Sequence, residues 1–182
     1  TKFGTGSIYF DGIGTETLKI LHSPNLNFGT GDFTIEFFIY FTSNPSGYKT
    51  IYSQGYNSTG GVLIQSANSS TALKFYISNN IAFTSDIFSL NTWYHVAWIR
   101  SGTDSKLFID GTQNQSTATS YGHDANNTTY NAEIGQATNG WSGSIVGGPY
   151  PFYGYIDEFR ITKGVARYTS NFTAPTEAFA NR

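Results

Sequence analysis

The sequence predicts an all-β fold, and three observations support this prediction. The 182 residues include 13 Tyr, 15 Phe and 3 Trp, only 12% are charged, and 20 are Gly. Aromatic side chains fit half-buried pleated surfaces, and Gly permits tight reversals of the chain. Several short stretches alternate apolar and polar residues and are separated by segments rich in Asn, Ser and Gly. Short strands at such even spacing are typical of a sandwich or barrel.

The strongest strand signal lies at residues 32–42. Five apolar side chains fall on one side of a period-two ribbon, namely Phe33, Ile35, Phe37, Ile39 and Phe41. A face this apolar must be covered by a second layer. Because almost no other stretch has a helical pattern, we expect that layer to be another sheet.

Further strands are expected at residues 7–10, 17–21, 49–53, 61–65, 73–77, 92–100, 106–109, 132–135 and 155–161. The strands at 92–100 and 106–109 are expected to pair antiparallel, and Asp110-Gly111 is a hairpin signal. The polar residues 112–130 indicate a long surface loop or an exposed edge ribbon. Residues 162–168 indicate the one helical turn. With no linker and no repeat, residues 1–182 are predicted to form a single domain.

Composition argues against several function classes. The formal charge is -2 and Lys and Arg form no cluster, which gives no electrostatic footprint for nucleic acid or an acidic membrane. No apolar run approaches the roughly 18 residues of a spanning helix, so membrane insertion is not expected. The absence of Cys removes disulfide and thiolate chemistry. Because Met is absent even at position 1, we expect a processed product or a domain of a longer protein.

Six strings of residues, taken in order, resemble one family. They are residues 6–12 (GSIYFDG), 27–36 (NFGTGDFTIE), 93–97 (WYHVA), 106–111 (KLFIDG), 134–135 (IG) and 154–161 (GYIDEFRI). The set resembles laminin G-like domains of the concanavalin A-like lectin/glucanase superfamily, over a core of about residues 6–179. Residues 161–175 further resemble versions found in bacteriophage structural and tail proteins and in bacterial surface proteins. The resemblance implies a jelly-roll sandwich of two curved antiparallel sheets.

The resemblance also implies a structural Ca²⁺ ion. In many members a carboxylate of the last strand and nearby backbone carbonyls bind Ca²⁺, and the last-strand position looks like Asp157. Calcium takes six to eight oxygen ligands, which the turns at Asp11 and Asp32 would help to supply. The alternative is that Asp11 is an ordinary turn residue and that Asp157 accepts backbone hydrogen bonds.

Sugar binding requires flat aromatic faces beside polar side chains. Trp141 and Tyr150 lie in a Gly-rich loop and are the first candidates for stacking, with Tyr121 and His123 in the other long loop behind them. Polar neighbours of the right type are Asn126, Asn127 and Asn139. The alternative is that the loop Trp folds back onto the core. Trp93 and Trp98 are expected to be core residues of a strand.

Catalytic patterns are missing from the sequence. No Glu-x-Asp-x-(x)-Glu string is present to supply the paired carboxylates of a glycosidase. A pair assembled across strands from Glu36, Glu133 or Glu158 is one alternative, and pairing of Glu36 or Glu158 with Arg100 or Arg160 is the other. The three histidines lie in a turn, a strand and a loop, without a Gly-x-Ser-x-Gly elbow, and His95 is expected to be structural.

We therefore expect a non-enzymatic, lectin-like adhesion module that binds a glycan or a cell-surface polysaccharide. It would be part of a larger extracellular or virion-surface protein. The alternative is a virion decoration, fibre or assembly module that contacts other virion or surface proteins. A glycoside hydrolase is the third hypothesis, and the absence of the paired-carboxylate pattern argues against it.

Overall fold

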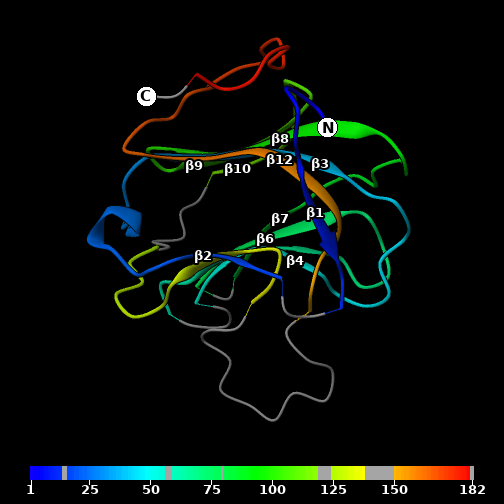
Figure 1. Ribbon diagram of the computed structural model, residues 1–182. Helices are drawn as coiled ribbons and strands as arrows, with labels where there is room; N and C mark the ends of the chain where they lie inside the picture. Colours follow the sequence, from blue (N-terminus) through cyan, green and yellow to red (C-terminus); the bar gives the residue numbers. More distant parts are fainter. Residues whose placement is uncertain (14–15, 56–58, 79, 119–123, 138–149, 181–182) are drawn as a thin grey trace.

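Two six-stranded antiparallel sheets are stacked face to face in the computed structural model (Figure 1), which describes residues 1–13, 16–55, 59–78, 80–118, 124–137 and 150–180. Sheet A has the order β1-β12-β3-β8-β9-β10, and sheet B the order β2-β11-β4-β5-β6-β7. The sheet A strands are β1 (Ile8–Asp11), β3 (Phe33–Tyr40), β8 (Trp93–Ser101), β9 (Asp104–Ile109), β10 (Thr112–Ala118) and β12 (Tyr153–Lys163). The sheet B strands are β2 (Leu18–Ile20), β4 (Thr50–Gln54), β5 (Val62–Ser66), β6 (Leu73–Ile77), β7 (Asn80–Thr84) and β11 (Ala132–Ile134). The predicted all-β jelly-roll sandwich is confirmed.

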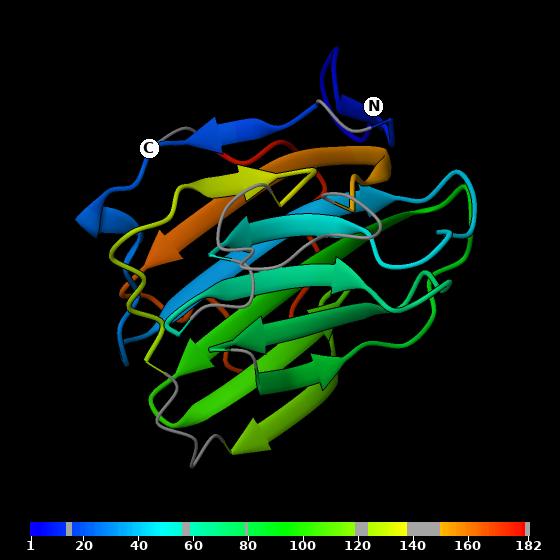
Figure 2. The ribbon, with the colours of Figure 1, turned by 90° about the horizontal axis from the view of Figure 1, so that it is seen from below.

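The central strand β3 lies between β12 and β8, as its apolar face requires. Its inward side chains are fully buried between the sheets, and the Phe33 ring meets the Trp98 ring edge-on at 5.2 Å. Trp98 in turn meets Phe75 of sheet B at 5.4 Å. Figure 2 shows sheet B face on, with the strands of sheet A behind it. The predicted antiparallel pairing of residues 92–100 with 106–109 is confirmed as the pair β8–β9.

The outer face of sheet A is partly covered by the C-terminal segment, residues 164–180. This segment runs over the sheet on the side away from sheet B (Figure 1). Tyr168 and Phe172 stack at 3.6 Å, and Phe172 contacts Phe108 of β9 at 5.5 Å. Phe179 contacts Phe38 of β3 at 6.2 Å. The C-terminal segment therefore buries one half of this face.

One local prediction needs correction, and one strand was missed. The predicted helical turn at 162–168 is wrong, because β12 continues to Lys163 and the chain after Gly164, which has φ +78°, is irregular and docks on β3. The edge strand β7 was not predicted. Residues 112–118 form the edge strand β10, in agreement with the edge-ribbon alternative. A 3₁₀ turn, η1, covers Pro24–Leu26. In the described ranges no helix is long and apolar enough to cross a membrane.

Candidate functional site

Four aromatic side chains form a continuous row on the outer face of sheet A. The strand register pairs Tyr9 with Tyr155, Tyr155 with Tyr40, and Tyr40 with Trp93. Residues that pair directly across strands point to the same face, so the four rings stand side by side. Neighbouring ring centroids are 4.9, 5.7 and 5.3 Å apart. This aromatic row crosses β1, β12, β3 and β8, a distance of about three strand spacings or roughly 14 Å.

The aromatic row lies on the half of sheet A that the C-terminal segment does not cover. Tyr9 is 44% exposed, and Tyr155, Tyr40 and Trp93 are half-buried. A shallow cavity of about 270 Å³ is lined by Tyr40, Trp93, Tyr155 and Thr1. Exposed ring faces above a cavity of this kind can stack on apolar surfaces of a ligand, while the phenol groups remain available for hydrogen bonds.

The hydroxyl group of Tyr9, at one end of the row, is held in its neutral form. A hydrogen bond with Tyr153, followed by burial, raises the pKa of Tyr9 to about 12. Tyr153 lies next to the row, with its ring 6.1 Å from that of Tyr9. At neutral pH the Tyr9 phenol is therefore an uncharged hydrogen-bonding group.

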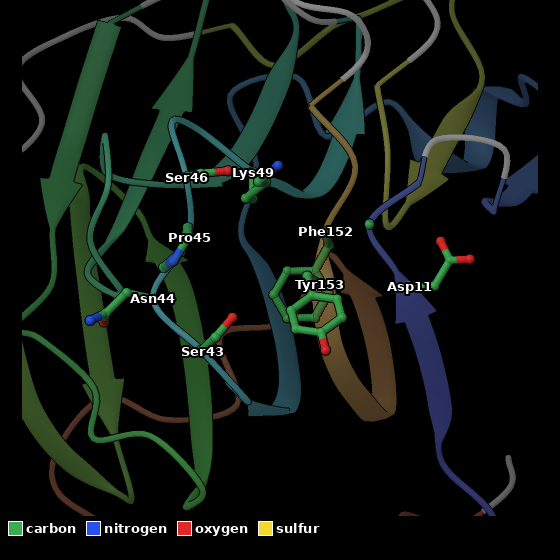
Figure 3. Close-up of a pocket in the computed structure, with 9 residues that line it drawn as sticks. Asp11, Ser43, Asn44, Pro45, Ser46, Lys49, Phe152 and Tyr153 are labelled. Atoms are coloured by element: carbon green, nitrogen blue, oxygen red, sulfur yellow. The ribbon is translucent and has the colours of Figure 1, made fainter.

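A polar pocket adjoins the row at the rim of the sandwich (Figure 3). We call it the rim pocket; its volume is about 180 Å³, and its lining residues are Asp11, Gly12, Ser43, Asn44, Pro45, Ser46, Lys49, Phe152 and Tyr153. Asp11 ends β1 and pairs with Tyr153 at the start of β12, and residues 43–49 connect β3 to β4. In Figure 3 the Tyr153 ring lies between Asp11 and Ser43. The rim pocket thus combines two aromatic rings, one carboxylate, one ammonium group and several small polar side chains.

Glu36 is the centre of a buried ionic cluster under the C-terminal segment. Its carboxylate accepts hydrogen bonds from the Arg160 Nε at 2.9 Å and from the Tyr168 hydroxyl at 3.0 Å, and lies 3.3 Å from His95 Nε2. The predicted alternative that Glu36 pairs with Arg160 is therefore confirmed. His95 is fully buried and its Nδ1 has no hydrogen-bond partner, so neither group faces a substrate.

The cluster changes two pKa values. Burial alone would raise the pKa of Glu36, but hydrogen bonds from His95 and Arg160 outweigh it and leave that pKa below its ordinary value. Burial, together with the nearby Glu36 charge, raises the pKa of Tyr168 to about 12. Glu36 is thus ionised and Tyr168 neutral in the same contact. This arrangement fixes the C-terminal segment to β3.

The other two glutamates considered for a catalytic pair, Glu133 and Glu158, each bind a different partner. Glu133 lies in sheet B, 3.2 Å from the Lys19 ammonium group, and Glu158 accepts a hydrogen bond from the Phe179 N–H at 2.6 Å. The cross-strand carboxylate pair of a glycosidase is therefore not formed by Glu36, Glu133 and Glu158.

Most of the predicted sugar-binding residues cannot be placed. Trp141, Tyr121, His123 and Asn139 lie outside the described residues. Tyr150 is described, and it packs against the cluster of Leu63 and Ala137 on the outer face of sheet B, with its ring 6.3 Å from Tyr48. Tyr150 is thus on the opposite face of the sandwich from the aromatic row.

The three predicted calcium ligands do not meet. Asp157 accepts the N–H groups of Lys2 and Phe3 at Oδ2 and that of Glu158 at Oδ1. Asp11 pairs with Tyr153, four residues along β12 from Asp157 and thus about 13 Å away. Asp32 lies near the far end of β12, where its carbonyl accepts the Gly164 N–H.

Together these positions do not fit a shared calcium site. The described residues contain no group of three or more His, Cys, Asp or Glu that could hold a metal ion. Asp157 instead accepts hydrogen bonds from backbone N–H groups, as the alternative interpretation predicted.

Sequence reasoning missed the aromatic row, and it placed Trp93 wrongly in the core. Trp98 is fully buried, whereas Trp93 is half-buried on the outer face. The spacing of the two Trp residues could have shown this, because they are five positions apart and residues an odd number apart on one strand point to opposite faces. If Trp98 faces the core, Trp93 must face outward, as Tyr40 does on β3.

Comparisons with known proteins identify the same architecture. A family profile described as "Concanavalin A-like lectin/glucanases superfamily" matches residues 13–167. No curated protein matches the chain. A suggested carbohydrate binding protein from Bacteroides ovatus has a TM-score of 0.67 at 16% identity, over 89% of this chain and 44% of its own.

Two further solved structures share the fold. Mouse laminin alpha1 domains LG4-5 give a TM-score of 0.62 at 12% identity, over 93% of this chain and 46% of theirs. The CBM40 of Ruminococcus gnavus IT-sialidase, bound to alpha2,3 sialyllactose, gives 0.60 at 13% identity, over 85% and 94%. The chain thus spans less than half of the first two structures. At these identities the likeness establishes the fold alone.

Proposed function

Because the chain belongs to the concanavalin A-like lectin/glucanase superfamily, we propose that it is a non-enzymatic carbohydrate-binding module. The observation that carries this proposal is the aromatic row. Four rings in direct cross-strand register form a continuous, partly exposed strip on the sheet. Two structures with the same fold are described as a suggested carbohydrate binding protein and as a module bound to alpha2,3 sialyllactose, which supports the proposal.

Binding would rest on stacking and hydrogen bonds. The apolar C–H faces of pyranose rings would lie on the rings of Tyr155, Tyr40 and Trp93, which cover an apolar area without a large loss of side-chain entropy. The hydroxyl of Tyr9 would hydrogen-bond the sugar hydroxyls at one end of the strip. Since the strip is roughly 14 Å long, its ligand would be an oligosaccharide chain and not a single ring.

The non-enzymatic part of the proposal rests on the carboxylates. A glycosidase needs two carboxyl groups on either side of the scissile bond. Glu36 is fully buried and bound by Arg160. Of the carboxylates beside the row, Asp157 accepts the N–H groups of Lys2 and Phe3 and lies about 13 Å along the sheet from Asp11, too far for a catalytic pair. The row can therefore hold a sugar chain without supplying the acid and the nucleophile for its hydrolysis.

The proposal places the domain where glycans are displayed. Its partner would be a glycan or a cell-surface polysaccharide, and its location the extracellular space or a virion surface. The neutral phenols and the low charge of the chain, -2 overall, suit recognition of uncharged hydroxyl groups by hydrogen bonds rather than by ion pairs.

A glycan array with four protein samples tests this proposal. The samples are wild type, Trp93→Ala, Trp93→Phe and the control Leu21→Ala, since Leu21 is 74% exposed and lies outside the row. We expect Trp93→Ala to bind at least about tenfold more weakly, equivalent to about 1.4 kcal/mol. Trp93→Phe should retain part of the affinity, and Leu21→Ala all of it.

Running the array in Ca²⁺ and again in a chelator measures any metal requirement of binding in the same experiment. Thermal unfolding of each variant establishes that it is folded. A folded wild-type domain that binds no glycan would contradict the proposal and favour an assembly module. Undiminished binding by Trp93→Ala would separate the activity from the aromatic row.

A further inference from the structure

The rim pocket is continuous with the aromatic row through Tyr153. Tyr153 is 37% exposed, and its ring lies 6.1 Å from that of Tyr9 at the end of the row. The same ring lines the rim pocket beside Asp11 (Figure 3). A ligand that lies on the row can therefore pass over Tyr153 into the rim pocket without leaving an aromatic surface.

The geometry of Asp11 prepares its carboxylate for a ligand. Asp11 Oδ1 accepts the Ile13 N–H at 2.7 Å, and the Asp11 N–H donates to Glu16 Oε2 at 2.8 Å. These two contacts fix the side chain and its backbone. A carboxylate has about four lone-pair sites, so capacity remains to accept hydroxyl groups from a ligand in the rim pocket.

Lys49 supplies the complementary donor. Its backbone N–H is bound to Ser66 Oγ at 2.9 Å, which anchors the residue at the start of β4. Across the described residues its ammonium group forms no ion pair with any carboxylate, Asp11 included. The rim pocket thus holds one acceptor and one donor of opposite charge that are not bound to each other.

We propose that the rim pocket binds one uncharged sugar ring at the end of the glycan that lies on the aromatic row. This inference rests on the proposed function. Tyr153 would stack on the ring, Asp11 would accept hydrogen bonds from its hydroxyl groups, and Lys49 would donate to a hydroxyl or ring oxygen. Ser43, Asn44 and Ser46 border the same space and would contact the remaining hydroxyls.

Size and charge both favour a single uncharged ring. The rim pocket measures about 180 Å³, below the roughly 300–1,000 Å³ of pockets that enclose drug-sized ligands. An acidic sugar would gain from Lys49 but would place its carboxylate in the same small space as Asp11. Like charges held this close cost free energy unless one of them is protonated. A ring with neighbouring hydroxyl groups satisfies both side chains instead.

The experiment is an array that carries neutral oligosaccharides beside their sialylated counterparts, such as lactose beside alpha2,3 sialyllactose. Wild type is compared with Asp11→Asn, Lys49→Gln, Trp93→Ala and the control Asp104→Asn. Asn at position 11 keeps the oxygen that accepts the Ile13 N–H, so the turn is preserved. Asp104 is an exposed residue at the start of β9, remote in the sheet order from β1.

We expect the strongest binding to neutral glycans, a tenfold or greater loss in Asp11→Asn and in Lys49→Gln, and no change in Asp104→Asn. Binding that is lost in Trp93→Ala but kept in both rim-pocket variants would overturn this inference alone. Tighter binding of sialylated glycans than of their neutral parents would also overturn it. No binding by folded wild type would overturn the proposed function together with it.

Discussion

Replacing Glu36 by Gln tests whether the buried cluster holds the C-terminal segment on sheet A. Glu36 is fully buried and accepts from Arg160 and Tyr168 at 2.9 and 3.0 Å, with His95 at 3.3 Å. A Gln amide has one oxygen and one NH₂ group, so at least one of these donors would then face another donor. The change preserves volume and removes only the charge and one acceptor.

The magnitude follows from the burial of the partners. Removing one member of a buried ion pair costs about 3–5 kcal/mol. The Arg160 side chain is 22% exposed, so water still solvates part of its charge and the lower end of this range applies. We expect a loss of about 3 kcal/mol in the free energy of unfolding. For a domain of this size that lowers Tm by roughly 6–12 °C, at about 2–4 °C per kcal/mol.

Urea denaturation and calorimetry of Glu36→Gln, beside Glu177→Gln as the exposed control, measure this loss. Glu177 lies in the C-terminal segment and is exposed, so its replacement should leave stability within about 0.5 kcal/mol. If Glu36→Gln were equally silent, the cluster would not contribute to stability in the way its geometry indicates, and the C-terminal segment would be held by its aromatic contacts and its other hydrogen bonds.

Two further predictions concern the same face. The pKa of Glu36 in the folded protein lies below its ordinary value of 4.5, so its stabilising contribution is complete above about pH 4.5. It is lost as the pH falls through the folded-state pKa; urea midpoints measured from pH 7 to pH 3 should therefore drop less steeply in Glu36→Gln than in wild type. Gly111 has φ +79°, and a Cβ there would collide with the carbonyl of Phe172. Gly111→Ala should cost about 2 kcal/mol or more, whereas Gly102→Ala, at φ +59° with open space, should cost about 1 kcal/mol of backbone strain. Equal losses in the two variants would show that the contact with Phe172 is unimportant.

Local patterns determined most of the strands, and tertiary contacts determined what the patterns left out. Period-two alternation identified β3 as a central strand, because it has one wholly apolar face, and the apolar and aromatic residues at 93–99 identified β8 as a second strong strand. The edge strand β7 carries only Ile81, Ala82 and Phe83 between polar ends, so its pattern is too short to be distinctive. The irregular path of residues 164–168 depends on contacts made across more than a hundred residues, such as the Thr34 hydroxyl bound to the Val165 carbonyl at 2.9 Å.

The candidate site was harder to predict, because it is assembled by register. Tyr9, Tyr40, Trp93 and Tyr155 come from four strands that are distant in sequence, and only the pairing of those strands aligns them. The sequence analysis looked for binding residues in two long loops, because aromatic residues in a loop are not needed to fill the core. Trp93 and Trp98 were both assigned to the core, although they lie on opposite faces of the same strand.

That second face of sheet A is divided into two parts with different chemistry. Around Glu36, His95 and Phe108 it is covered by the C-terminal segment, which supplies Tyr168 and Phe172 as partners. Around the aromatic row Thr1 borders the cavity, and the rings remain half-buried or exposed. Apolar surface left in contact with water has a cost in stability of roughly 25 cal/mol per Å². The sheet covers part of this face and leaves five neighbouring aromatic residues half-buried or exposed, Tyr153 included, which is the apolar surface that the proposed glycan site requires.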